Sequence, residues 1–233
     1  TGKQYSIEFE PIQNNYAGNG SRNIETPYPF NSGSNLQISE NLMGVASIFK
    51  ILPNKAFNSK ILELGCGWAN TSLNLARAGK QVTAVDVDST CGNVIDYWSP
   101  KLNCENNIKF ICSSFDSIGE VLKEDAEFDE ILFFKSFHHC LDPNSLLSEC
   151  TRLLKKGGSI AFVAEPVHGN YYVPFGLRYD GTSIFMIKKH GWLELGFDYT
   201  FFNEMCNKHG LELTSREALC PIPTMNYLIY QKT

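Results

Sequence analysis

Short apolar runs alternate with segments of helical periodicity through most of this 233-residue chain. A short apolar run bounded by turn residues is typical of a buried strand, whereas apolar positions that recur every three or four residues are typical of a helix. The pattern predicts strands at 61–64, 81–87, 108–112, 130–134 and 159–164, and helices at 40–52, 70–78, 91–98, 116–123 and 142–155. Strands that alternate with helices in this way form a parallel sheet with right-handed crossovers.

The two ends of the chain depart from that alternation. Residues 1–38 are rich in Asn, Gly, Ser and Pro without a sustained period, so we expect an irregular N-terminal arm. We expect residues 39–233 to form a single domain, whose first helix is capped by Ser39 and ended by Pro53. The pattern lapses over about 165–195, where we expect a substrate lid.

The C-terminal part completes the predicted sheet. A helix at 199–209 precedes two β-like stretches, 211–219 and 225–231, with no helix between them. Two consecutive strands without a crossover helix pair antiparallel, so a C-terminal hairpin is expected. The predicted fold class is therefore α/β, with a Rossmann-like, mostly parallel seven-stranded sheet and helices on both faces.

Composition narrows the classes of partner. The net charge is −5, and the basic residues are scattered, which disfavours nucleic acid. No apolar run reaches the roughly 18 residues needed to span a bilayer, so no membrane partner is expected. The eight cysteines form no C-x-x-C pair, which favours reduced thiols and a cytoplasmic location. The oligomeric state is not predicted by these features.

The stretch "SKILELGCGWANTSLNLARAG" carries the first candidate chemistry. A strand runs into Gly65-Cys66-Gly67 and then into a helix, and ligands of such sheets bind beyond the C-terminal ends of the strands. A glycine without Cβ lets backbone amides approach a ligand. Asp86 ends the next strand, where a carboxylate can accept both hydroxyls of a ribose. NAD and S-adenosylmethionine (SAM) both fit this much of the pattern.

Three residues favour SAM over NAD. The dinucleotide fingerprint has a third glycine where this chain has Asn70, and the bulky Trp68 lies in the approach to the helix N-terminus. Glu63 precedes the first glycine by two residues, and an acid there suits a cationic ligand such as a sulfonium better than a pyrophosphate.

Four stretches, "ILELGCGWANTSLNLA", "VTAVDVD", "FDEILFFKSFHHCLDP" and "LLKKGGSIAFVAEP", resemble successive motifs of the class I SAM-dependent methyltransferases of small-molecule type, over about residues 40 to 220. The resemblance implies that the acidic glycine turn holds the methionine part of SAM and that Asp86 holds the ribose. The chain departs from the family at the third strand, where serines replace the common Gly-Asp-Ala. The expected cofactor-binding residues are Glu63, Gly65, Cys66, Gly67, Asp86, Val87, Ser113, Ser114, Phe115 and Lys135.

Methyl transfer requires an aligned acceptor and, for an alcohol, a base. His139 in "SFHHCLDP" is a candidate for either the base or the cofactor wall, and His138 for the wall. Glu165 is a second candidate, with His168 as its partner. We predict no metal site.

The predicted activity is methyl transfer from SAM to a small molecule. Tyrosines of the lid, Tyr171 and Tyr172 among them, together with Glu and His residues favour O-methylation of a sugar or a phosphorylated precursor. The resemblance to compact bacterial members of the family implies a place in surface-polysaccharide biosynthesis. Methylation of another metabolite, a SAM-binding protein without catalysis and an NAD-dependent oxidoreductase are the alternatives. Tyr16 and Tyr28 of the arm are expected to fold over the cofactor.

Overall fold

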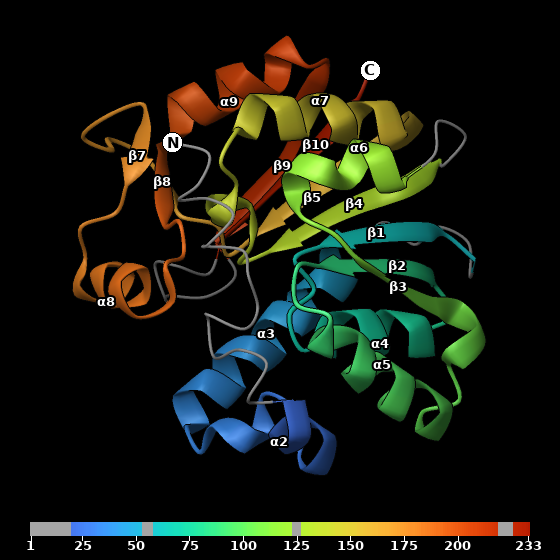
Figure 1. The fold of residues 1–233 in the computed structure, drawn as a ribbon. Coiled ribbons are helices and arrows are strands. Elements are labelled where there is room, and N and C mark those ends of the chain that lie inside the picture. Colours follow the sequence, from blue (N-terminus) through green and yellow to red (C-terminus); the bar gives the residue numbers. More distant parts are fainter. Residues whose placement is uncertain (1–19, 53–57, 123–126, 219–225) are drawn as a thin grey trace.

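The computed structural model describes residues 20–52, 58–122, 127–218 and 226–233 (Figure 1). Its centre is a seven-stranded sheet with the order β3-β2-β1-β4-β5-β10-β9. The strands are β1 Lys60–Leu64, β2 Gln81–Asp86, β3 Ile108–Cys112, β4 Phe128–Phe134, β5 Leu154–Val163, β9 Leu211–Ala218 and β10 Asn226–Lys232. The first five are parallel, and β10 lies antiparallel to β5 and β9, so the predicted sheet and its terminal hairpin are confirmed.

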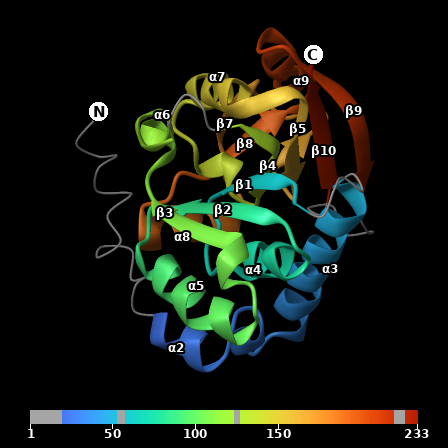
Figure 2. The ribbon, with the colours of Figure 1, turned by 90° about the vertical axis from the view of Figure 1, so that its right-hand side faces the viewer.

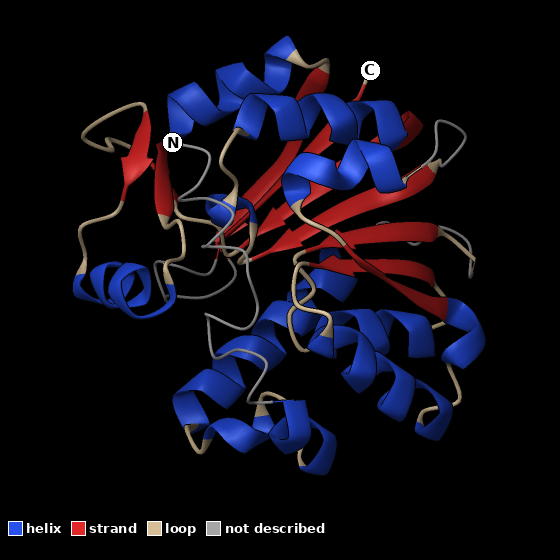
Figure 3. Cartoon of the chain, viewed as in Figure 1, coloured by secondary structure: helices blue, strands red, loops and turns tan. Residues whose placement is uncertain are grey.

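Helices cover both faces of this sheet (Figure 2, Figure 3). They are α2 Gly20–Glu25, α3 Asn35–Ile51, α4 Asn70–Arg77, α5 Thr90–Lys101, α6 Ile118–Val121, α7 Pro143–Leu153, α8 Gly181–His190 and α9 Tyr199–Lys208. One apolar core joins the sheet to α3, α4 and α5, and a second joins it to α6, α7 and α9. None of the helices in the described ranges combines the length and apolarity that a bilayer crossing requires.

The N-terminal arm contains more helix than the sequence indicated. Helix α3 begins at Asn35, because the side chain of Ser34 caps it by accepting from the backbone N–H of Gln37. Ser39, the predicted cap, instead donates its hydroxyl to the Leu36 carbonyl inside the helix. Helix α2 precedes α3 and packs beside α5. The predicted helix end at Pro53 lies outside the described residues.

The predicted lid region forms a second, small sheet with the order β6-β8-β7. Helix α8 comes between β7 and β8 in the sequence (Figure 1). Its strands are β6 Val167–His168, β7 Phe175–Leu177 and β8 Leu195–Asp198. Strands of two to four residues are too short to establish a period, which is why the pattern lapses there. Helix α8 is fixed by its ends: Asp180 accepts from the Ser183 backbone N–H, and Gly191 closes the helix at φ 72°.

Candidate cofactor and acceptor cavity

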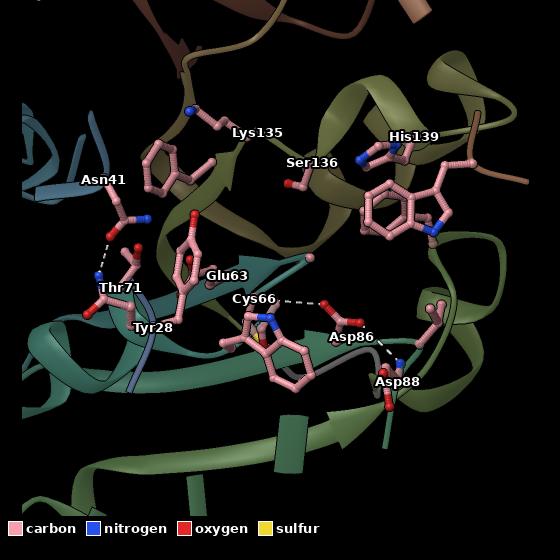
Figure 4. Close-up of a pocket in the computed structure, with 18 of the residues that line it drawn as sticks. Tyr28, Asn41, Glu63, Cys66, Thr71, Asp86, Asp88, Lys135, Ser136 and His139 are labelled. Carbon is pink, nitrogen blue, oxygen red and sulfur yellow. Dashed lines mark hydrogen bonds between the residues drawn. The ribbon is translucent and has the colours of Figure 1, made fainter. Parts of the chain in front are cut away.

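A cavity of about 520 Å³ lies at the C-terminal ends of β1, β2, β3 and β4, within the size range of small-molecule sites (Figure 4). Helix α3 and the segment that runs from α8 to Leu193 complete its wall. Nine of the residues predicted to bind the cofactor line it: Glu63, Gly65, Cys66, Gly67, Asp86, Val87, Ser113, Phe115 and Lys135. The tenth, Ser114, does not; its carbonyl accepts a hydrogen bond from the Ser113 hydroxyl.

The glycine turn after β1 is held in a backbone conformation that favours glycine. Gly65 has φ 76° and Gly67 has φ 50°, both in the left-handed region. A Cβ added at Gly65 would lie 2.5 Å from the Cβ of Ser136, at the end of β4. The two strand ends therefore approach so closely that only glycine fits, and the turn leaves its backbone open toward the cavity.

Acidic groups gather on the cofactor side of the cavity. Glu63 is only 1% exposed, and the Ser72 hydroxyl donates to its carboxylate. Burial raises the pKa of Glu63 to about 8 against the effect of the Ser72 hydrogen bond, and the nearby charge of Asp86 adds to the rise.

Asp86 is fixed by the backbone of the glycine turn and of its own strand end. Its Oδ2 accepts from the Gly67 N–H at 2.8 Å and its Oδ1 from the Asp88 N–H at 3.1 Å (Figure 4). Burial raises the pKa of Asp86 as well. Two carboxyl groups kept in this low-polarity wall are stabilised in their charged forms by a cation, so the residues present fit the positive charge of SAM.

His139 is the predicted catalytic residue that the structure places in the cavity wall. Its Nδ1 lies 2.6 Å from the carbonyl oxygen of Leu193. A carbonyl only accepts, so Nδ1 carries the proton and Nε2 keeps a lone pair. Burial lowers the pKa of His139 well below its usual value, and the adjacent His138 lowers it further, so the ring is neutral at pH 7.

The structure does not place Glu165 or His168 in the cavity. Glu165, at 1% exposure, pairs with His138 at 2.7 Å instead of the expected His168. The backbone explains the difference: the chain turns at Ala164, φ 54°, which directs Glu165 beneath the end of β4. His168 lies half-buried on β6, paired in the small sheet with β8.

The tyrosines of the predicted lid also lie elsewhere. Tyr171 and Tyr172 border a separate shallow depression beside Phe201 and Glu204, away from the cavity. Of the two arm tyrosines, Tyr28 lines the cavity, whereas Tyr16 is outside the described residues.

Several wall residues were not singled out from the sequence: Asn41, Thr71, Asp88, Phe134, Ser136, Met186, Trp192 and Leu193. Asn41 comes from α3, where it accepts a hydrogen bond from the Asn70 side chain (Figure 4). Asp88 and Ser136 lie within quoted motifs at strand ends, so their position in the sequence could have indicated that they line the cavity. Nothing local in the sequence indicates that Met186 and Trp192 face the same space as β1.

One group in the described part of the chain has a spacing that a metal ion accepts. Ligand atoms of His138, His139 and Glu194 lie within 4.8 Å of one another. Glu194 already lies 3.7 Å from the Arg178 guanidinium. That cation neutralises the carboxylate, and we assign no metal to the group.

Comparison with known proteins points to one domain family. Residues 62–162 match a family described as a methyltransferase domain. A ubiquinone biosynthesis O-methyltransferase of Idiomarina loihiensis is 29% identical over 106 residues, covering 46% of this chain and 42% of that protein. A protein of the same name from Ralstonia nicotianae is 26% identical over 182 residues, covering 73% and 74%. The chain thus spans less than half of the first relative and about three quarters of the second.

The fold has solved counterparts. The structure of Burkholderia thailandensis 1,6-didemethyltoxoflavin-N1-methyltransferase, with its acceptor and S-adenosylhomocysteine bound, superposes with a TM-score of 0.62. The two chains are 17% identical, and the match covers 93% of this chain and 87% of that one. At this identity the likeness concerns the fold.

Proposed function

We propose that this chain is a class I SAM-dependent methyltransferase that methylates a hydroxyl oxygen of a small, largely apolar acceptor, which its match to a methyltransferase domain and its fold support. SAM, when bound, supplies a methyl group on a positively charged sulfur. The glycine turn, Glu63 and Asp86 would hold the positively charged and ribose portions of SAM, and Phe115 would border its adenine. These assignments are supported by the position of the residues in one cavity wall.

The observation that carries the proposal is the state of His139. Its Nδ1–H is committed to Leu193, so the neutral ring offers Nε2 as the base for the acceptor's hydroxyl proton. Because the pKa of His139 is lowered, the base form persists well below pH 6.5. The acceptor's hydroxyl proton would pass to His139 Nε2 as its oxygen bonds the methyl carbon, and the electron pair of the broken carbon–sulfur bond would stay on the sulfur of S-adenosylhomocysteine.

The surroundings of His139 favour an apolar, aromatic acceptor over a sugar. Met186, Trp192 and Leu193 face the cavity beside it, and the Trp192 ring centroid is 5.5 Å from that of His139. An indole and a thioether bury apolar surface and stack on planar rings. The tyrosines and the Glu165 carboxylate that supported a sugar acceptor lie outside this cavity. The relatives are named for O-methylation in ubiquinone biosynthesis, which supports an oxygen atom as the methyl acceptor.

The test is a transfer assay with SAM labelled in its methyl group and two acceptor panels, substituted catechols and phenols in one, free and nucleotide-linked sugars in the other. We expect O-methylated phenols, identified by mass spectrometry. Replacement of a general base costs about 100-fold to 10,000-fold in rate, so H139A is expected to lose transfer while S-adenosylhomocysteine affinity stays within about threefold.

Two results would contradict the proposal. Transfer to sugars and not to phenols would show that the acceptor class is wrong. Tight binding of S-adenosylhomocysteine without transfer to either panel would favour a SAM-binding protein without catalysis.

A further inference from the structure

Glu165 has a buried carboxylate that the cavity does not use. Its Oε1 accepts from the backbone N–H groups of Ser136 at 2.7 Å and Phe137 at 2.9 Å. Its Oε2 lies 3.2 Å from the His138 backbone N and 2.7 Å from the His138 Nδ1. Four donors on one carboxylate leave no lone pair directed at an acceptor in the cavity, so Glu165 is not a base for the acceptor.

These four donors belong to the turn that carries His139. The 3-10 turn Phe137–His139 follows Ser136, and its first backbone N–H groups have no partner within the turn. An anion placed against such N–H groups stabilises the turn and fixes its orientation. Glu165 therefore anchors the backbone on which His139 is mounted, from the end of the neighbouring strand β5.

His138 continues the chain of contacts toward the cavity wall. With its Nδ1 directed at Glu165, its Nε2 faces Glu194 at 3.6 Å, and Arg178 lies 3.7 Å from the same Glu194 oxygen. His138 and Glu194 are 6% and 5% exposed, so this charge chain is shielded from water. It links the end of the main sheet to the segment that leads into β8.

That segment is also the one that orients the His139 ring. Leu193, whose carbonyl receives the His139 Nδ1–H, directly precedes Glu194. The two imidazoles lie side by side, with ring centroids 4.1 Å apart. Consecutive histidines thus face consecutive residues: His138 faces Glu194, and His139 holds Leu193. A shift of Glu194 moves the carbonyl that selects the His139 tautomer.

We propose that Glu165 and His138 are positioning residues, which hold His139 in the orientation and tautomer that leave its Nε2 free for the acceptor. The assignment rests on the proposed function of His139 and adds two residues that do not touch the acceptor. Glu165 acts on the backbone of the turn, and His138 acts on the carbonyl partner of the ring through Glu194.

Four variants separate these links. E165Q removes the anion from the turn. In H138N the amide nitrogen replaces Nδ1 and keeps the donor to Glu165, whereas in H138Q the amide replaces Nε2 and reaches toward Glu194 only. E130Q is the matched control, because Glu130 is an equally buried carboxylate of β4, 2% exposed, that accepts from Ser159.

Two measurements are made on each variant: the kcat of methyl transfer and the ring ¹⁵N chemical shifts of His139, assigned by their loss in H139Q. The wild type and E130Q should show a protonated Nδ1. E165Q and H138N should show a mixture of tautomers and a kcat reduced by about 10-fold to 100-fold, as expected for a displaced catalytic group. H138Q should retain more of the wild-type kcat than H138N, because it keeps a group directed at Glu194.

The ring shifts keep this test independent of the proposed function. If the wild type transfers no methyl group, the proposed function fails, and the tautomers of His139 still decide whether Glu165 and His138 position the ring. Wild-type shifts in both E165Q and H138N would overturn the inference. A decrease in kcat in E130Q as large as that in E165Q would also overturn it, because replacement of any buried glutamate would then have the same effect.

Discussion

At the scale of single residues, the cavity depends on a carboxyl group kept where water cannot reach it. Glu63 is buried in the wall, so its charged form is costly until a cation arrives. The raised pKa, about 8, means that most of the ligand-free protein carries a protonated Glu63 at pH 7. The folded chain binds this proton more tightly than the unfolded chain does, so Glu63 contributes stability at low pH that is lost as pH rises toward 8.

SAM binding should therefore release a proton from Glu63. We expect SAM affinity to rise with pH up to about 8, by no more than tenfold per pH unit, and then to level off, because the cation favours the carboxylate. Calorimetry at pH 6.5, 7.5 and 8.5, in two buffers of different ionisation enthalpy, measures both the affinity and the protons released.

The control for that measurement is E63Q, which keeps a hydrogen-bonding group but cannot titrate. The amino group of SAM titrates in both proteins, so the difference between the two pH profiles belongs to Glu63. Identical profiles for the wild type and E63Q would show that another group takes up the proton.

At the scale of secondary-structure elements, the sequence predicted the elements with a clear hydrophobic period and missed features that depend on contacts between distant segments. The strands of the main sheet are apolar runs between turn residues, so their positions agree with the structure within a few residues. Strand β5 starts at Leu154, earlier than the predicted 159, and its pairing with β4 shifts register between Leu154 and Ser159, where Gly157 has φ 74°.

The residues of the candidate site also fall into a group that the sequence could predict and a group that it could not. Residues that end strands, such as Gly65 and Asp86, were predictable because parallel strands bring their C-terminal ends to one edge of the sheet. The partner of Glu165 was not, because His138 is 27 residues from Glu165 in the sequence whereas His168 follows it closely, and only the backbone turn at Ala164 directs Glu165 to the distant histidine.

Helix α8 offers a prediction at this scale, because neighbouring side chains on it face different surroundings. Met186 lines the cavity, whereas Phe185 is 54% exposed. M186A should raise the KM for a phenolic acceptor about tenfold, equivalent to about 1.4 kcal/mol of lost apolar contact, with little change in SAM affinity. Steady-state kinetics with each substrate varied in turn measures the two effects.

F185A is the matched variant, with a large apolar side chain removed from the same helix on its exposed side. We expect its KM values to match those of the wild type. An equal rise in acceptor KM for F185A would mean that the helix as a whole, and not the Met186 contact, controls acceptor binding.

At the scale of the whole molecule, the cavity joins parts of the chain that are far apart in the sequence. Tyr28 and Asn41 come from the N-terminal part, the glycine turn from β1, and Trp192 from the segment after α8. The described strands of the C-terminal hairpin, β9 and β10, complete the sheet and do not line this wall. A ligand that touches all three parts therefore stabilises the folded state beyond the strands it directly contacts.

S-Adenosylhomocysteine at 100 times its dissociation constant should stabilise the folded chain by about 2.7 kcal/mol. For a chain of this size, that corresponds to a rise of about 5–10 °C in the unfolding temperature.

The contacts of S-adenosylhomocysteine should centre on the glycine turn and Asp86, so amide exchange should slow there. The segment from Met186 to Leu193 should be protected fully only when an acceptor is also bound. Thermal unfolding and hydrogen exchange measure the two effects, and NADH at the same concentration is the control, because the acidic wall around Glu63 disfavours a pyrophosphate. A comparable stabilisation by NADH would mean that the wall accepts an anion, and the assignment of its acids to a cationic cofactor would be wrong.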